Sequence, residues 1–203
     1  RCLVANASRC GRLGFEADAA LAAGGRFGAV ASVSGADHPI VLAQLVAGTT
    51  FGTLTGAGVY DLVGLAPAES APDAEQRLAG AATPISSVGV VARLGESDFA
   101  AAVSSAGILR VPRGQLGAVA VEGAAVHAGD YGAVAATGDS RTLIRSQLAK
   151  RVYDQLAAGR AADEAVKEAL ADVPSGVVVG VAAISRSGAH AAANSPWELA
   201  QSD

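Results

Sequence analysis

The spacing of apolar residues changes from one segment of the chain to the next, and each spacing predicts a different element. Small and branched residues alternate over residues 27–33, which predicts a strand. Apolar residues recur at helical spacing from Ile40 to Val46, directly after Pro39, a residue that suits the first turn of a helix. A strand over residues 51–55 and a short helix over residues 59–63 are expected next.

Residues 64–83 interrupt this pattern and are the best linker candidate in the chain. The segment contains Pro67 and Pro72 and is rich in Ala, Glu and Asp. Such a composition is typical of a connection, so we expect one set of elements before it and a second set after it.

The second set begins with two strands, over residues 87–93 and 99–103, joined by a Gly-Glu-Ser-Asp turn. They are expected to pair as antiparallel neighbours. Further elements follow at regular spacing: a strand over residues 131–136, helices over residues 141–157 and 163–171, and a closing hairpin of residues 176–184 and 189–193.

The order of these elements predicts an α/β (α+β) fold with two sheets. Strand and helix do not alternate as strictly as in a doubly wound parallel sheet, and no glycine fingerprint of a nucleotide site follows a strand. Helices outside two stacked sheets would give a four-layer αββα sandwich of the N-terminal nucleophile hydrolase type. With 203 residues, the chain suits a single domain, residues 1–203, with a sizeable core.

The composition excludes several function classes. Apolar residues make up 51% of the chain and charged residues 17%, which is far from the balance of disordered proteins. The net charge of −4 argues against nucleic acid as a partner, because nucleic-acid-binding proteins carry a basic face. No apolar run reaches the roughly 18 residues that a membrane span needs, so no membrane partner is expected.

The two cysteines, Cys2 and Cys10, lie too close in sequence for a disulfide between them to crosslink distant parts of the fold. No metal-ligand spacing surrounds them. We expect two free thiols in a reducing compartment, which favours a cytoplasmic location. The histidines are scattered as well, so neither a metal nor a cofactor is expected. The chain does not begin with Met, and we expect a further N-terminal piece before Arg1.

Hydroxyl side chains gather at the ends of the predicted strands. Ser86 and Ser87 directly precede an apolar strand, and Ser105 follows 18 residues after Ser87 at the end of the next strand. Thr137 and Gly138 stand between another strand and a helix. A hydroxyl at the first position of a buried strand is what an N-terminal nucleophile hydrolase needs, because cleavage before it frees an α-amine that serves as the base.

Short motifs occur in a fixed order along nearly the whole chain. They are Gly-Phe-Glu-Ala-Asp-Ala at residues 14–19, Phe-Gly-Ala-Val at 27–30, Ser-Val-Gly-Val-Val at 87–91, Ala-Ala-Ala-Val-Ser-Ser at 100–105, Ala-Thr-Gly at 136–138 and the closing hairpin of residues 180–195, which ends in Asn194-Ser195. With them the chain resembles the asparaginase-type N-terminal nucleophile hydrolases: isoaspartyl peptidase/L-asparaginases, glycosylasparaginases and taspases. Each motif alone is weak, and their order and spacing together carry the resemblance.

The resemblance implies an amidohydrolase or peptidase with a defined site. Ser87 would be the nucleophile, and autocatalytic cleavage of the Ser86–Ser87 peptide would free its α-amine, whose ordinary pKa of about 8 suits a base near neutral pH. Ser105 would orient Ser87, while Thr137 and Gly138 would form the oxyanion hole. Residues 1–86, N-terminally incomplete, and 87–203 would become the α- and β-subunits of one protomer, and a homodimer is expected.

Several positions depart from the family pattern. The nucleophile is Ser87 where the family has Thr, so the methyl group that fixes the rotamer is missing. Gln115 and Ala118 stand where the family has an Arg and an Asp that hold the α-carboxylate and α-amino group of the substrate, and Arg113 lies two residues early on the same loop. Free L-asparagine would be held poorly, because Gln115 cannot form the charge-assisted fork of an Arg. A small peptide-like or otherwise capped amide is favoured as substrate.

Two other functions stay open. The Ser86–Ser87 junction, Gln115 and Ala118 also fit a catalytically silent family member, a binding or scaffold protein that never cleaves itself. Another interpretation is a specialised amide-bond enzyme of a biosynthetic pathway. Cleavage before Ser87 distinguishes an enzyme from the silent member, and a panel of aspartyl peptides and blocked amides distinguishes the biosynthetic enzyme from an asparaginase.

Overall fold

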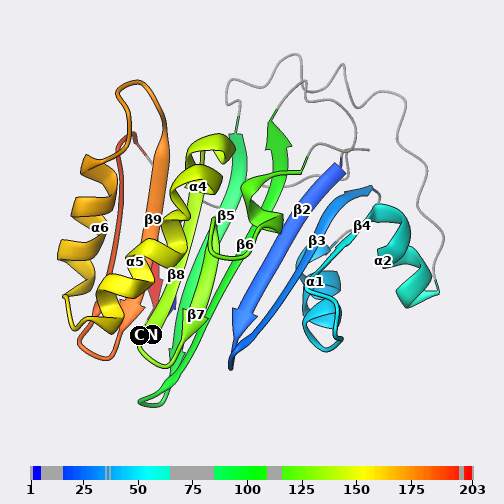
Figure 1. Ribbon diagram of the computed structural model, residues 1–203, viewed down its shortest axis with the longest axis horizontal. Coiled ribbons are helices and arrows are strands. Elements are labelled where there is room, and N and C mark those ends of the chain that lie inside the picture. Colours follow the sequence, from blue (N-terminus) through cyan, green and yellow to red (C-terminus); the bar gives the residue numbers. More distant parts are fainter. Residues whose placement is uncertain are drawn as a thin grey trace.

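The computed structural model describes residues 2–5, 16–34, 36, 38–64, 85–108, 116–196 and 199–202. These residues form two β-sheets and the helices that pack against them (Figure 1). The mixed α/β class predicted from the sequence is therefore confirmed. Most of the predicted linker, from residue 65 onward, lies outside the described residues, as does Cys10.

Within the described residues, the larger sheet holds seven strands in the order β11-β1-β5-β6-β2-β3-β4. Neighbouring strands are antiparallel except for β3 and β4, which are parallel. The predicted hairpin of β5 and β6 is confirmed and contributes inner strands of the sheet. The strands span Cys2–Ala5 (β1), Glu16–Ala23 (β2), Arg26–Ser34 (β3), Thr53–Thr55 (β4), Ile85–Leu94 (β5), Asp98–Ile108 (β6) and Leu199–Ser202 (β11).

The smaller sheet, as far as it is described, has four antiparallel strands in the order β10-β9-β8-β7. They span Val126–Gly129 (β7), Gly132–Gly138 (β8), Val179–Ser185 (β9) and Ala189–Ala193 (β10). The closing hairpin predicted from the sequence is the β9–β10 pair, and the predicted strand over residues 131–136 is β8.

Helices cover the sheets from the outside. The helix α1 (Pro39–Ala47) packs against β2 and β3, and it lies close because Gly28 has no side chain: a Cβ there would be 2.2 Å from the Ala47 amide nitrogen. The helix α2 (Gly56–Val63) follows β4. On the smaller sheet, α5 (Leu148–Ala157) contacts β7 and β8, while α6 (Ala162–Ala171) contacts β9 and β10 (Figure 1).

The single helix predicted over residues 141–157 is wrong, because the structure has two helices there, α4 (Ser140–Ser146) and α5. Gln147 between them has a left-handed φ of 46°, which ends the first helix. The first turn of α5 is hydrogen-bonded to a different segment, since the Lys150 N–H donates to the Gly123 carbonyl at 2.8 Å. Apolar spacing hid the break, because both helices bury residues on the same side.

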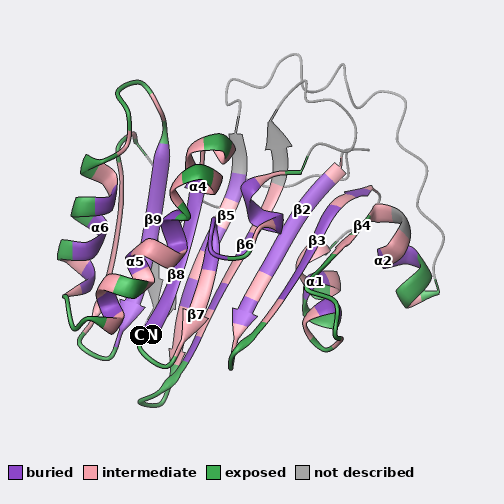
Figure 2. Cartoon of the chain, viewed as in Figure 1, coloured by how far each residue is buried: buried purple, intermediate pink, exposed green. Residues whose placement is uncertain are grey.

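The core between the two sheets is built of small residues. Side chains alternate across β2: Ala20 and Ala22 belong to the cluster between the sheets, whereas Ala19 belongs to the cluster under α1. On β5, a Cβ added to Gly89 would lie 3.3 Å from the Ala135 Cβ of β8, so the two sheets approach closely at this point. Figure 2 shows buried residues along β2, β8 and β9.

The sequence patterns do not predict β1, β2, β7 and β11. The strand β2 reads Glu-Ala-Asp-Ala-Ala-Leu-Ala-Ala, and alanine and acidic residues have low strand propensity. It forms a strand because it pairs with β3 on one side and β6 on the other. Pairing between distant segments, which local spacing does not reveal, decides this element.

Candidate active site

Ser87 lies on β5 and has 8% of its surface exposed. Its hydroxyl donates a hydrogen bond to the hydroxyl of Ser105 on β6, with 2.9 Å between the two oxygens. The residues are directly opposite each other in the antiparallel pair, so their side chains lie on the same face of the sheet. The two serines that the sequence analysis selected therefore meet in a single contact.

The face of β5 that carries Ser87 looks onto the smaller sheet. Gly89, two residues after Ser87, is on the same face because side chains alternate along a strand. A Cβ on Gly89 would lie 3.5 Å from the Cγ2 of Thr137 on β8. The face of β5 that carries Ser87 thus packs against β8 close to Thr137.

Thr137 and Gly138 end β8 at the start of α4. The Thr137 side chain is 4% exposed, and its Oγ1 is buried without a hydrogen-bond partner among the described residues. Gly138 has a φ of +132°, and a Cβ there would lie 2.2 Å from the Val178 carbonyl oxygen, so only glycine fits. Asp139 then caps α4, since its Oδ1 accepts the Thr142 N–H at 2.8 Å.

The segment that the sequence analysis assigned to substrate binding is described only in part. Arg113 and Gln115 lie outside the described residues. Ala118 begins a short 3₁₀ turn (η1, Ala118–Ala120) and is 1% exposed. Its N–H donates to the Ser140 hydroxyl at 3.3 Å, which connects this segment to the turn after Thr137 and Gly138. The methyl group of Ala118 offers a substrate no charge.

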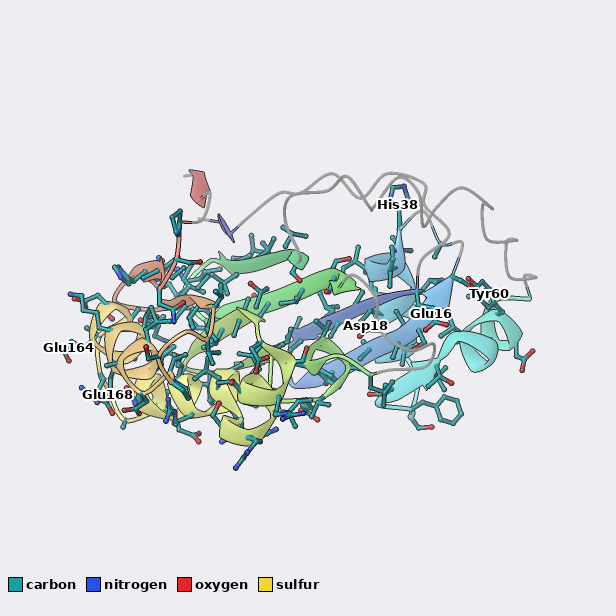
Figure 3. The ribbon with its side chains drawn as sticks, turned by 90° about the horizontal axis from the view of Figure 1, so that it is seen from above. Glu16, Asp18, His38, Tyr60, Glu164 and Glu168 are labelled. Carbon is teal, nitrogen blue, oxygen red and sulfur yellow. The ribbon has the colours of Figure 1, made fainter. Side chains whose placement is uncertain are left out.

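Asp18 on β2 is a polar residue at this site that the sequence analysis did not select. Its Oδ1 accepts the Ser32 N–H at 2.9 Å, and its Oδ2 accepts the Gly117 N–H at 2.8 Å. It is directly opposite Ser105 in the β2–β6 pair. Figure 3 shows Asp18 and Glu16 on the same strand. A carboxylate inside an alanine-rich segment was the available signal, because Asp is rarely buried without a partner.

The pKa of Asp18 is raised above its ordinary value. Burial is the main cause, because it disfavours the charged carboxylate. The hydrogen bonds from the backbone of Ser32 and Gly117 act in the opposite direction, and the negative charge of Glu16 adds a smaller upward contribution. A charge that is costly to bury is thus held beside the serine pair.

The contribution of Asp18 to stability is expected to fall as the pH rises. Its pKa in the folded state lies above the unfolded value of 3.8, so between these two values the folded state binds more protons than the unfolded state. Stability from this group is therefore complete below the unfolded pKa and is lost as the pH rises through the folded pKa. Urea unfolding of the natural chain and of Asp18→Asn across this range checks the sign. A free-energy difference between the two proteins that does not change with pH would contradict it.

The Ser86–Ser87 peptide lies at an irregularity of β5. The pairing of β5 with β6 shifts register between Ile85 and Ser87, as at a β-bulge. The strand β5 runs from Ile85 to Leu94 across this junction. Bulges re-aim side chains, and this one lies directly beside the expected cleavage junction.

In the described part of the chain, no three His, Cys, Asp or Glu side chains are arranged to hold a metal ion. None of the described helices is long and apolar enough to cross a membrane.

Comparison with known proteins identifies the family. A family model described as asparaginase matches residues 65–201, which include Ser87, Ser105, Thr137 and Gly138. The chain belongs to the asparaginase family. This is the family of isoaspartyl peptidases, asparaginases and taspases, so the resemblance stated from the sequence is confirmed. No curated protein matches the chain in a sequence search.

Membership in the asparaginase family indicates hydrolase activity toward amide bonds. The match covers β5, β6 and the smaller sheet, whereas Asp18 on β2 lies outside it. The hydroxyl pair and the Thr137–Gly138 turn are thus inside the matched region. Asp18, which is opposite Ser105 in the β2–β6 pair, comes from the part of the chain before the matched region.

Proposed function

We propose that the protein is an amidohydrolase of the N-terminal nucleophile class that activates itself by cleavage before Ser87. The observation that carries this proposal is the 2.9 Å hydrogen bond from the Ser87 hydroxyl to Ser105. The pair lies on the face of the larger sheet that packs against β8, where the buried Thr137 hydroxyl has no partner among the described residues. The asparaginase family supplies the class of reaction.

Self-cleavage would begin with attack of the Ser87 Oγ on the carbonyl carbon of Ser86. A C–O bond forms, the hydroxyl proton passes to the departing nitrogen, and the C–N bond of the Ser86–Ser87 peptide breaks to leave an ester and a free α-amine. One water molecule then hydrolyses the ester, which restores the Ser87 hydroxyl and leaves Ser86 as a C-terminal carboxylate.

In the cleaved protein, the α-amine of Ser87 would take the proton of its own hydroxyl during attack on a substrate amide. The negative charge of the tetrahedral intermediate would be stabilised by the Thr137 hydroxyl and the Gly138 N–H. The proton would then go to the leaving amine, and water would release the acid product from Ser87. Ser105 orients the nucleophile throughout, because it accepts the hydrogen bond of Ser87.

The preferred substrate would be a peptide-like or otherwise capped amide and not free L-asparagine. Ala118 presents a methyl group where a carboxylate would be needed to hold a substrate ammonium group. The neutral Gln115 in the sequence points the same way for the substrate carboxylate. A specialised biosynthetic amide-bond enzyme remains a variant of this proposal, with the same site and a different substrate.

The assembly is part of the same proposal. Contacts place α1 on the larger sheet and α5 and α6 on the smaller one, and the two sheets pack together, which supports a four-layer αββα sandwich. Residues 1–86 and 87–203 would be its two subunits after cleavage. We expect a homodimer because the family resemblance implies one, and a cytoplasmic location because the cysteine usage favours it.

Self-cleavage is expected to convert the purified chain into two fragments that separate at Ser86–Ser87. A denaturing gel and mass spectrometry measure the fragments, and N-terminal sequencing of the C-terminal product, residues 87–203, should give Ser-Val-Gly-Val. The cleaved protein is then assayed with aspartyl dipeptides, blocked amides and L-asparagine, and the blocked or peptide substrates should be turned over faster. A chain that stays intact after prolonged incubation would overturn the proposal.

A second candidate function is a catalytically silent family member that acts as a binding or scaffold protein. The specific observation in its favour is Ala118, which is packed in the core where the resemblance calls for a charged, substrate-holding Asp. The same gel distinguishes the two functions, because a silent member keeps a single band with the natural Ser87.

A further inference from the structure

The inference concerns Asp18, a buried carboxylate that the proposed reaction does not use directly. Asp18 is 8% exposed and lies on the face of β2 that carries Ala20, the face turned toward the smaller sheet. Its neighbours Ala17, Ala19 and Ala20 are buried alanines. A charge in such a strand is expensive unless it is hydrogen-bonded, so its contacts explain its position.

Both carboxylate oxygens of Asp18 hold backbone segments in place. One accepts the N–H of Ser32, whose φ of 52° marks a bend in β3, and the other accepts the N–H of Gly117. The approach at Gly117 is tight, since a Cβ there would lie 2.6 Å from the Asp18 Oδ2. Asp18 thus fixes the start of the segment that continues into Ala118.

The same segment is held from its other side by the turn that forms the proposed oxyanion hole. The Ala118 N–H donates to the hydroxyl of Ser140, which stands two residues after Gly138. Asp18, Gly117 and Ser140 therefore join β2 to the end of β8 through consecutive hydrogen bonds. A shift of Asp18 would be transmitted to Ser140 and so to the position of the Gly138 N–H.

Asp18 also stands in a row with the two serines. It is directly opposite Ser105, and Ser105 is directly opposite Ser87. Opposite side chains in antiparallel strands have Cβ atoms about 5 Å apart. The carboxylate that holds the Gly117–Ala118 segment therefore lies close to the hydroxyl pair.

We infer that Asp18 is a positioning residue of the site: one carboxylate oxygen holds the Gly117–Ala118 segment against β2, the other holds the backbone at Ser32, and the negative charge strengthens both hydrogen bonds. This inference rests on the proposed function. Residues 1–86 would then contribute, through Asp18, to the chemistry of the site in residues 87–203.

The test uses self-cleavage of the full chain, because this reaction needs no identified substrate. Asp18→Asn keeps the size of the side chain but removes its charge and places an NH₂ group where one backbone N–H must be accepted. Its self-cleavage rate is expected to fall about 10²-fold, the size of effect that a small misplacement of reacting groups produces. Two controls accompany it: Glu16→Gln, which neutralises the other carboxylate on β2, and Val166→Ala, which weakens the core in α6 far from β2. Both should cleave within a few-fold of the natural chain.

The pH profile of self-cleavage separates positioning by the charge from a loss of folded structure. In the natural chain the rate should fall at acid pH as Asp18 takes up a proton, above the ordinary range for Asp because its pKa is raised. Among the described charged groups, Glu16 is the one whose charge acts on Asp18, and Glu16→Gln should keep this acid limb. Asp18→Asn should lose it, while circular dichroism shows that the variant is folded.

The outcomes separate this inference from the proposed function. Cleavage of the natural chain together with a slow, flat profile for Asp18→Asn supports the inference. If Asp18→Asn cleaves as fast as Val166→Ala, or keeps the acid limb, the inference is overturned and the proposed function stands. If the natural chain itself does not cleave, the proposed function is overturned, and the inference with it.

Discussion

Replacing Ser87 with alanine is expected to leave the chain in one piece and to abolish amide hydrolysis. The variant removes the only atom of residue 87 that can attack a carbonyl, and loss of a nucleophile from a catalytic unit lowers turnover by about 10⁶-fold. Folding should be nearly unchanged, because the hydroxyl makes one hydrogen bond, to Ser105, worth about 1 kcal/mol. A denaturing gel and thermal unfolding measure the two effects.

Two variants control this experiment. Ser87→Thr keeps the hydroxyl and adds the methyl group that fixes its rotamer, so it should still cleave. Ser104→Ala removes the neighbouring hydroxyl, which is opposite Val88 and therefore on the other face of β6. It should cleave at the natural rate. Cleavage of Ser87→Ala at the same junction would rule out Ser87 as the nucleophile.

The serine pair was predictable from the sequence for a geometric reason. Residues 87 and 105 flank a short turn at nearly equal distances, so a hairpin of β5 and β6 brings them opposite each other. The Thr137–Gly138 turn was predictable as well, because a strand, a glycine and a helix cap follow one another directly. Local order along the chain explains why these residues meet, whereas the resemblance to the asparaginase family is what singled them out in the sequence.

The role of Asp18 was harder to predict from the sequence, because its neighbours come from three separate segments of the chain. Ser32, Ser105 and Gly117 become its neighbours only when β2 pairs between β3 and β6. Its alanine-rich surroundings resemble a helix in composition, so neither the strand nor the face of Asp18 followed from spacing. The break at Gln147 was missed for a similar reason, since the apolar spacing continues across it.

The small residues at the meeting of the sheets connect the composition to the site. A Cβ added to Gly89 would lie 3.3 to 3.6 Å from Ala135, Thr137 and Val103, so a side chain larger than a methyl group there would push β5 away from β8. That close approach is what brings the Ser87 face of one sheet to the Thr137 end of the other. The low aromatic content of the chain, 4%, is thus a requirement of the geometry as well as a feature of composition.

Replacing Thr137 with valine is expected to make the protein more stable and less active. The Thr137 Oγ1 is buried and has no hydrogen-bond partner among the described residues. An unsatisfied buried hydroxyl costs about 1–3 kcal/mol, and valine has nearly the same shape without it, so the free energy of unfolding should rise by about 1 kcal/mol. If the hydroxyl stabilises the oxyanion, self-cleavage and turnover should fall by about 10²- to 10³-fold.

Thr53→Val is a control for this prediction, because it makes the same substitution at an exposed threonine of β4. Its hydroxyl donates to the Ala120 carbonyl at 3.1 Å, so it is a threonine with a partner. Its loss should lower stability by about 1 kcal/mol and leave the rate within a few-fold of the natural value. Urea unfolding measures the stability of both variants, and the gel assay measures their rate of self-cleavage. If the Thr137 hydroxyl serves the reaction, the free energy of unfolding should rise in Thr137→Val and fall in Thr53→Val. A Thr137→Val protein that is destabilised but fully active would show that the hydroxyl serves the fold and takes no part in the reaction.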